Sequence, residues 1–298
     1  MTIRRRAFLN FLPAIVLAAC AVLVAAGARA VEPIALRIPA HPGERAAGGP
    51  VELDALLWPQ PGPGPRGAVV LLHGCAGWRD RAGAPMARDL DWARTLSALG
   101  HVVLQVDSLG PRGERSLCAQ GEGRRVRVGV ERARDAYAAL LFLQSRPEIR
   151  PDAVALMGWS NGGGTVLWAM ARDSHARPPG LAHDFAAAIA FYPGCRTLSQ
   201  RRTAWRPVAP LLLLVGADDD WTPAPPCMAL AERAGEAVDL RVYPGAHHDF
   251  DAPDLPLRVR GGVGSTASGT ATTGTDPAAR ADVLARVPAF LVAYAPPR

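Results

Sequence analysis

The sequence predicts a doubly wound α/β domain, in which helices cover both faces of a parallel sheet. Short apolar runs recur along the chain, and a run that is apolar at every position is typical of a strand buried on both faces. Amphipathic stretches with helical spacing separate these runs, and such alternation is typical of an α/β domain. The length of 298 residues fits one domain of this kind, of about 250 residues, with a short extension.

The apolar runs and the helical stretches give the expected order of elements. The expected strands are Val51–Trp58, Ala68–Leu72, Val102–Val106, Ala153–Met157, Ala187–Phe191, Leu211–Val215 and Leu240–Tyr243. The expected helices are Pro85–Leu99, Arg132–Gln144, Gly162–Arg172, Pro225–Ala234 and Pro277–Tyr294. Three segments lack both patterns: Pro59–Arg66 and Ser108–Arg125 are expected as loops, and Gly261–Thr275 as a flexible loop or a linker.

Composition excludes several classes of protein. A hydrophobic fraction of 49% and a net charge of +6 exclude wholesale disorder and a coiled coil. All 33 basic residues are arginine, which, beside abundant alanine, indicates a compositional bias of the genome. We therefore expect no nucleic-acid partner.

The first thirty residues have the pattern of an export signal. Arg4, Arg5 and Arg6 precede an apolar run from Phe11 to Ala28, and residues 28–30 read Ala-Arg-Ala, a small-x-small cleavage site. Residues 5–9 also resemble a twin-arginine signal. A lipoprotein signal with a lipid on Cys20 and an uncleaved membrane anchor are the alternatives. We expect a signal over residues 1–30, a single domain over 31–298, and a periplasmic or extracellular location, with membrane contact only through the signal segment.

Removal of this segment changes both the charge and the cysteine count. The first thirty residues hold four arginines and no acidic residue, so the remaining chain has 29 basic and 27 acidic residues, a net charge of +2. Nothing in that balance calls for a polyanionic partner. The four remaining cysteines are Cys75, Cys118, Cys195 and Cys227, and an oxidising compartment favours two disulfides, for which three pairings exist. A zinc site is less favoured because no two of these cysteines have CxxC spacing.

The strongest chemical motif is Gly158-Trp159-Ser160-Asn161-Gly162-Gly163. It follows an apolar strand and precedes a helical stretch, which is the context of a nucleophile elbow. In such a turn Ser160 is raised at the end of the strand, beside the first turn of the helix. We expect Ser160 to be a nucleophile.

A serine nucleophile needs a base, and the base needs an acid to orient it. In this type of fold the order along the chain is Ser, acid, His. Three aspartates follow the expected strand Leu211–Val215, and the spacing from Gly216 and Pro223 favours Asp219, with Asp220 as the alternative. All three could instead cap the helix near Pro225.

The expected base lies just past the last expected strand. His248 precedes Phe250 by two residues in a G-x-x-H-x-F pattern, and His247 is the alternative. For the oxyanion hole, the loop His73–Gly77 supplies small residues, and we expect the N–H groups of Cys75 and Asn161 to be the donors.

Tryptophans and arginines near these loops suggest contacts to a substrate. Trp78, Trp159 and Trp221 lie within a few residues of the expected catalytic loops, where they would either wall a pocket or pack in the core beneath it. A loop that holds Arg112, Arg115, Arg124 and Arg125 could meet an acidic substrate, but a solvated loop is the favoured interpretation.

Together these motifs resemble the dienelactone hydrolase family of α/β-hydrolases. The resemblance rests on residues 73–77, 107–113, 158–163, 192–195, 216–223 and 243–250, in that order, and covers residues 50 to 295. It implies a mostly parallel sheet of about eight strands with a minimal lid. It also supports the pairings Cys75–Cys118 and Cys195–Cys227, because the members of each pair follow neighbouring strands.

One departure from the family pattern affects the expected function. Dienelactone hydrolase itself has a cysteine nucleophile, and this chain has Ser160 in its place. The resemblance therefore implies a hydrolase of small-molecule carboxylic esters, with lactones as a further substrate class, that needs no metal or cofactor. The alternatives are a peptidase or an acyltransferase on the same triad, or a non-catalytic binding protein.

Overall fold

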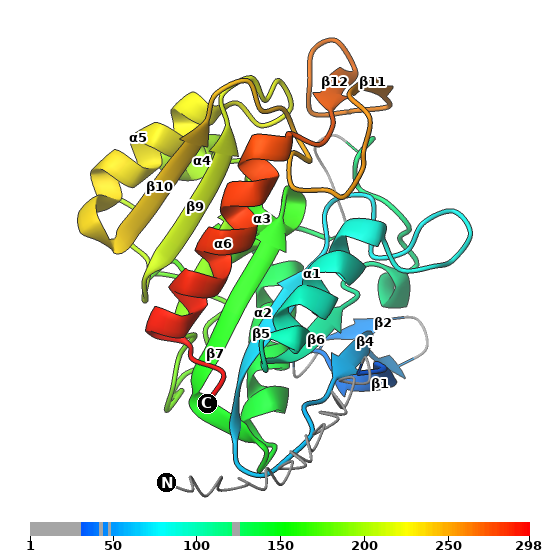
Figure 1. The fold of residues 1–298 in the computed structure, drawn as a ribbon, viewed down its shortest axis with the longest axis vertical. Helices are drawn as coiled ribbons and strands as arrows, with labels where there is room; N and C mark the ends of the chain where they lie inside the picture. The colour runs from blue at the N-terminus through cyan, green and yellow to red at the C-terminus, as the bar shows by residue number, and fades with distance from the viewer. Residues whose placement is uncertain (1–30, 42–43, 47–48, 121–125) are drawn as a thin grey trace, which may run out of the picture.

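The main strands of the chain lie in one eight-stranded sheet (Figure 1). The computed structural model describes residues 31–41, 44–46, 49–120 and 126–298. The expected signal over residues 1–30, Cys20, Arg124 and Arg125 lie outside these residues. In spatial order the sheet contains β1 (Ile34–Pro39), β4 (Glu52–Trp58), β6 (Val102–Val106), β5 (Arg66–Leu72), β7 (Ile149–Trp159), β8 (Ala187–Phe191), β9 (Leu211–Gly216) and β10 (Val238–Tyr243).

The sheet is mostly parallel, as the sequence predicts. The strands from β6 to β10 pair in parallel, whereas β1 and β4 pair antiparallel with each other and β4 pairs antiparallel with β6. Every residue of β5, β6, β8 and β9 is buried, which explains their continuous apolar runs. The two central strands, β5 and β7, are neighbours, so the loops at their carboxyl ends meet above the middle of the sheet.

Helices cover both faces of the sheet. The helical elements are α1 (Ala87–Ala98), η1 (Gly110–Arg112), α2 (Glu131–Gln144), α3 (Asn161–Ala169), α4 (Arg196–Ser199), α5 (Ala224–Ala234), η2 (Gly235–Ala237) and α6 (Pro277–Tyr294). Apolar side chains of α1 and α6 pack on one face, in front in Figure 1, and those of α2, α3 and α5 pack on the other. This two-sided layering is the doubly wound α/β-hydrolase architecture that the sequence predicts.

The expectation of a flexible loop or linker at Gly261–Thr275 is wrong for part of the segment, and residues 262–269 are the loop that joins two strands. The ends of the segment belong to an antiparallel pair, β11 (Arg258–Gly261) and β12 (Thr270–Thr273), which stands at the carboxyl edge of the sheet in Figure 1. The carboxylate of Asp220 accepts hydrogen bonds from the backbone N–H and the hydroxyl of Thr272. The sequence did not reveal this pair because its strands are short and only Ala271 of β12 and the adjacent Val263 pack in an apolar cluster. A second short pair joins β2 (Arg45–Ala46) and β3 (Gly49–Pro50).

The loop after β6 is also more ordered than predicted. Arg112 was expected on a solvated loop, but its side chain is 8% exposed and pairs with Glu44 and Asp135. A buried guanidinium needs carboxylate partners, and these come from distant parts of the chain, so no local pattern reveals them.

Two disulfides hold loops at the same edge of the sheet. Cys75 pairs with Cys118 and Cys195 with Cys227, which are the pairings that the family resemblance implies. Disulfides are typical of proteins in an oxidising compartment, outside the cytoplasm. Among the described residues, no helix combines the length and apolar character needed to cross a membrane.

Candidate active site

Ser160 occupies a sharp turn between β7 and α3. Its φ is +53°, a left-handed value that costs energy for a residue other than glycine and that raises its side chain out of the strand. Two glycines make the turn sterically feasible, because a Cβ on Gly158 would lie 2.5 Å from the carbonyl oxygen of Gly162, and one on Gly162 would lie 2.1 Å from that of Leu72. The local sequence therefore forms a nucleophile elbow.

Ser160, His248 and Asp219 form one hydrogen-bonded chain. The Nε2 atom of His248 is 2.9 Å from Ser160 Oγ, and its Nδ1 atom is 2.8 Å from Asp219 Oδ2. The three residues come from loops after β7, β9 and β10, and all are at least 90% buried. The structure thus brings together the nucleophile, acid and base that the sequence predicts.

The neighbouring aspartates have other surroundings. Asp219 Oδ1 accepts the backbone N–H groups of Trp221 and Thr222, which fixes its carboxylate against His248. Asp220 binds Thr272 in β12 instead. Neither flanking aspartate caps α5, whose N-cap is Pro223 and has no side-chain hydrogen bond, so the capping alternative is wrong.

For both His248 and Asp219, burial and the charge of the partner shift the pKa in opposite directions. Burial alone would lower the pKa of His248, but the Asp219 carboxylate outweighs it, and the pKa of His248 is raised. Burial would likewise raise the pKa of Asp219, but the charge of His248 and the bonds from Thr222 hold that pKa below its ordinary value. Asp219 therefore stays ionised and favours the imidazole tautomer that has its proton on Nδ1.

Two other histidines near the site, His247 and His73, make no hydrogen bond to Ser160 among the described residues. The half-buried His247 makes no hydrogen bond through its buried Nδ1 atom among the described residues. His73 is buried, with Nδ1 2.7 Å from the carbonyl oxygen of Gly74 and Nε2 accepting the backbone N–H of Ser108. Burial lowers the pKa of His73 far below its ordinary value, so it is a neutral structural residue.

Cys75 and Asn161 flank Ser160 on two different loops. Asn161 begins α3, where the first N–H groups lack intrahelical acceptors, and neither its N–H nor that of Cys75 has an acceptor among the described residues. The buried guanidinium of Arg132 bridges the two loops, because it donates to the His73 carbonyl oxygen at 2.7 Å and to the Asn161 side-chain oxygen. Burial lowers the pKa of Arg132 to about 10, so it remains a cation. Sequence reasoning did not single out Arg132, since nothing local marks it.

A comparison with family models identifies the family of the chain. The model described as "Dienelactone hydrolase family" matches residues 53–295. The chain belongs to this family.

Individual relatives of the chain are more distant. YtaP of Bacillus subtilis (strain 168), which is named as a hydrolase, is 29% identical over 126 residues, 38% of this chain and 42% of YtaP. The match therefore spans less than half of that relative. Esterase 2 of Thermogutta terrifontis, solved in a form phosphorylated by paraoxon, has a TM-score of 0.59 and 18% identity, with 87% of this chain and 94% of that chain covered.

The description of a second similar solved structure mentions dienelactone hydrolase. P91, a dienelactone hydrolase-like promiscuous phosphotriesterase from metagenomic libraries, has a TM-score of 0.55 and 19% identity, with 88% of this chain and 99% of that chain covered. At these identities the two structures are evidence of a shared fold only.

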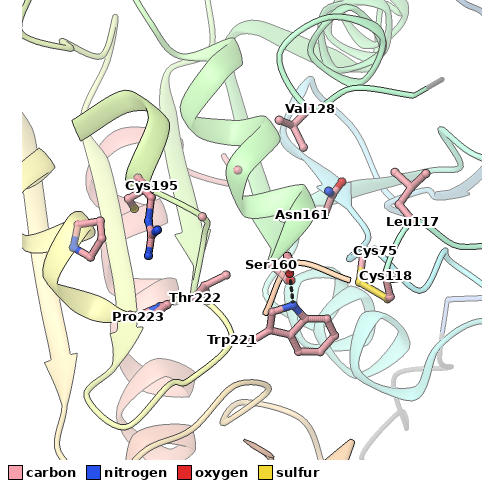
Figure 2. Close-up of a pocket in the computed structure, with 15 residues that line it drawn as sticks. Cys75, Leu117, Cys118, Val128, Ser160, Asn161, Cys195, Trp221, Thr222 and Pro223 are labelled. Carbon is pink, nitrogen blue, oxygen red and sulfur yellow. Dashed lines mark hydrogen bonds between the residues drawn. A yellow bond between two sulfur atoms is a disulfide. The ribbon is translucent and has the colours of Figure 1, made fainter. Parts of the chain in front are cut away.

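Beside Ser160 this member of the dienelactone hydrolase family has a pocket of about 350 Å³ (Figure 2). Both disulfides contribute to its wall, together with Leu117, Val128 and Trp221. Most of the lining is apolar, although Arg196 also contributes to it, and Figure 2 shows Ser160 between the Cys75–Cys118 disulfide and Thr222.

The three tryptophans near the expected catalytic loops have different positions. Trp221 lines the pocket, and its ring lies 4.6 Å from the His248 ring. Trp159 is fully buried beneath the elbow and stacks on Phe191, while Trp78 stacks with Arg79 away from the pocket beside Ser160. Trp159 packs in the core because the chain turns at Ser160 and leaves Trp159 inside the sheet. Trp78 lines a separate cavity of about 160 Å³ together with Arg79.

The buried carboxylate of Asp251, which the sequence analysis did not single out, holds side chains that pack against the site. Asp251 accepts hydrogen bonds from the Tyr192 hydroxyl at 2.6 Å, Trp92 Nε1 at 2.7 Å and Trp159 Nε1 at 2.8 Å. The Tyr192 ring lies 4.5 Å from the His248 ring. One carboxylate thus fixes both the residue before Ser160 and the ring beneath the base. Its position three residues after His248 was the one available signal.

Proposed function

We propose that this protein is an exported serine hydrolase that cleaves carboxylic esters of small molecules through an acyl-enzyme on Ser160. The hydrogen-bonded chain from Ser160 through His248 to Asp219 is the observation that supports this best. Membership of the dienelactone hydrolase family supports hydrolysis. The two disulfides support a location outside the cytoplasm.

The proposed reaction has two steps that share the same residues. His248 Nε2 takes the proton of Ser160 Oγ as the oxygen attacks the ester carbonyl, and Asp219 stabilises the imidazolium that forms. The N–H groups of Cys75 and Asn161 hold the oxyanion, a contact whose loss costs about 3 kcal/mol of transition-state stabilisation. His248 then protonates the departing alcohol, and it later activates the water that releases the acid.

A panel of substrates tests this function. We expect the wild type to hydrolyse short p-nitrophenyl esters and simple lactones, and Ser160→Ala to lose at least about 10⁴-fold in kcat. p-Nitroanilide peptides serve as the matched amide substrates. Cleavage of the amides but not of the esters would contradict the proposal and favour a peptidase.

A further inference from the structure

A second, larger hollow of about 980 Å³ lies next to the candidate active site, and arginines dominate its wall. The lining includes Arg79, Arg81, Arg115, Arg258 and Arg260, but only one carboxylate, that of Asp80. Arg258 and Arg260 both belong to β11, a strand that the sequence did not predict. The hollow therefore has a strong excess of positive charge.

None of these five arginines pairs with a carboxylate among the described residues. Elsewhere in those residues eleven arginines do so. Oδ1 of Asp80 is already bound by the backbone N–H groups of Ala82 and Ala84. Arg79 Nη1 donates to the Gly83 carbonyl oxygen and Arg260 Nη2 donates to Cys118 Sγ. The other guanidinium donors of the hollow are available to a ligand.

Two of the five guanidinium groups are oriented by aromatic rings. Arg260 lies over the Trp221 ring at 5.1 Å, and Arg79 lies over the Trp78 ring at 4.4 Å. Stacking leaves the edge of a guanidinium free for hydrogen bonds, and a fixed guanidinium binds carboxylates and phosphates in a bidentate manner. Arg81, Arg115 and Arg258 are exposed and add charge around these two.

A small cavity connects the arginine hollow to the serine. This cavity of about 40 Å³ is lined by Ser160 and His248, and it shares Ala76, Met86 and Arg260 with the arginine hollow. The apolar pocket on the other side of Ser160 has Asn161 in its wall but not His248. Since His248 gives its proton to the departing alcohol, the alcohol of the ester faces the arginines and the acyl group faces the apolar pocket.

From this arrangement we infer the class of substrate: an ester of an apolar acyl group with an alcohol that carries two or more anionic groups. The inference rests on the proposed function and deepens it. Five guanidinium groups exceed what one carboxylate can engage, so a multiply charged alcohol fits the hollow better than a singly charged one. Such a cluster also raises the local concentration of anionic substrates and their rate of association.

A matched pair of acetate esters tests this inference. 5-Acetoxyisophthalate carries two carboxylates on the alcohol side, and 5-acetoxyisophthalamide is its neutral counterpart. We expect kcat/KM for the dianion to exceed that for the diamide about tenfold at low salt, and the ratio to fall in about 1 M NaCl, where screening is strong. Phenyl hydrogen glutarate, with its charge on the acyl side, should gain a smaller advantage over phenyl acetate, because a single arginine, Arg196, lines the acyl-side pocket.

Variants distinguish the effect of the arginines in the hollow from the effects of overall charge and of the intrinsic reactivity of the esters. Arg258→Gln/Arg260→Gln, and independently Arg79→Gln/Arg81→Gln on another part of the wall, should each lower the ratio several-fold. The matched control Arg94→Gln/Arg202→Gln removes two exposed arginines elsewhere and should keep the ratio.

The inference would be overturned if neither double variant of the arginine hollow changed the ratio of kcat/KM for the dianion to kcat/KM for the diamide. It would also be overturned if the control variant lowered this ratio equally. Wild type that hydrolyses neither acetate ester, nor any other ester, would instead contradict the proposed function, and the inference would fall with it.

Discussion

Three consecutive aspartates follow β9, and the fold gives each different surroundings. Asp219 is buried against His248, Asp220 binds Thr272 in β12, and Asp218 is exposed. Spacing along the sequence favours Asp219 as the acid but leaves Asp220 as an alternative. A shift of the loop by one residue would point the other carboxylate toward His248. The contact that decides between them comes from β12, fifty residues away, and no local pattern contains it.

The pH dependence of hydrolysis tests the link between Asp219 and His248. His248 acts as a base only when it is neutral, and its pKa is raised, so kcat/KM should increase with pH through a midpoint above the ordinary histidine value of about 6.5. Asp219→Asn removes the charge that raises this pKa, so the midpoint should move to lower pH, while kcat falls about 10⁴-fold. Asp218→Asn, which changes an exposed carboxylate, is the control. A midpoint that stays in place in Asp219→Asn would contradict this role.

At the scale of elements, the elbow depends on the close approach of α3 to β5. Gly162→Ala places a Cβ 2.1 Å from the Leu72 carbonyl oxygen, far inside van der Waals contact. We expect it to lower the free energy of unfolding by about 1 to 3 kcal/mol, or more if β5 cannot shift, in urea denaturation. Gly164→Ala in the same helix is the control, because its Cβ would meet no atom closer than 4.0 Å. Equal stability of the two variants would show that the packing argument is wrong.

Most of the strands that the sequence predicted are buried, although it also predicted the largely exposed edge strand β10. The strands with continuous apolar runs, such as Ala187–Phe191, are buried on both faces, so hydrophobicity alone marks them. β1 was missed because it is an antiparallel edge strand with a largely exposed pattern, and β11 and β12 were missed because they pair outside the main sheet. A buried strand is recognised in the sequence by its apolar run, whereas a strand held by pairing alone has no such pattern.

At the scale of the molecule, the disulfides hold together the loops that form the pocket. The Cys195–Cys227 bridge closes a segment with a sequence separation of 32, and its removal should lower the free energy of unfolding by about 3 to 4 kcal/mol. Urea denaturation of Cys195→Ser/Cys227→Ser, beside the wild type with and without reductant, measures this. A variant that is as stable as the oxidised wild type would contradict this prediction.

The expected export signal is a second property of the whole chain. We predict that cells that export this protein release a mature form that begins at Val31, and N-terminal sequencing checks this. Arg5→Lys/Arg6→Lys should block export if the signal is of the twin-arginine type. A mature protein that still begins at Met1, or one with a lipid on Cys20, would contradict the predicted cleavage.

The candidate site shows how far sequence reasoning extends. Ser160, Asp219 and His248 follow strands and carry local motifs, so the sequence alone selected them. Arg132, Asp251 and the arginine hollow depend on contacts between distant segments, and a net charge of +2 over residues 31–298 gives no sign of five arginines in one hollow. Long-range contacts of this kind need the folded structure.

Fluorophosphonate labelling followed by peptide mapping tests the central claim most directly. The account predicts one covalent label, on the peptide that contains Ser160, and no label on folded Ser160→Ala. A folded wild type that does not react, a label on another residue, or equal labelling of Ser160→Ala would contradict the assignment of Ser160 as the nucleophile.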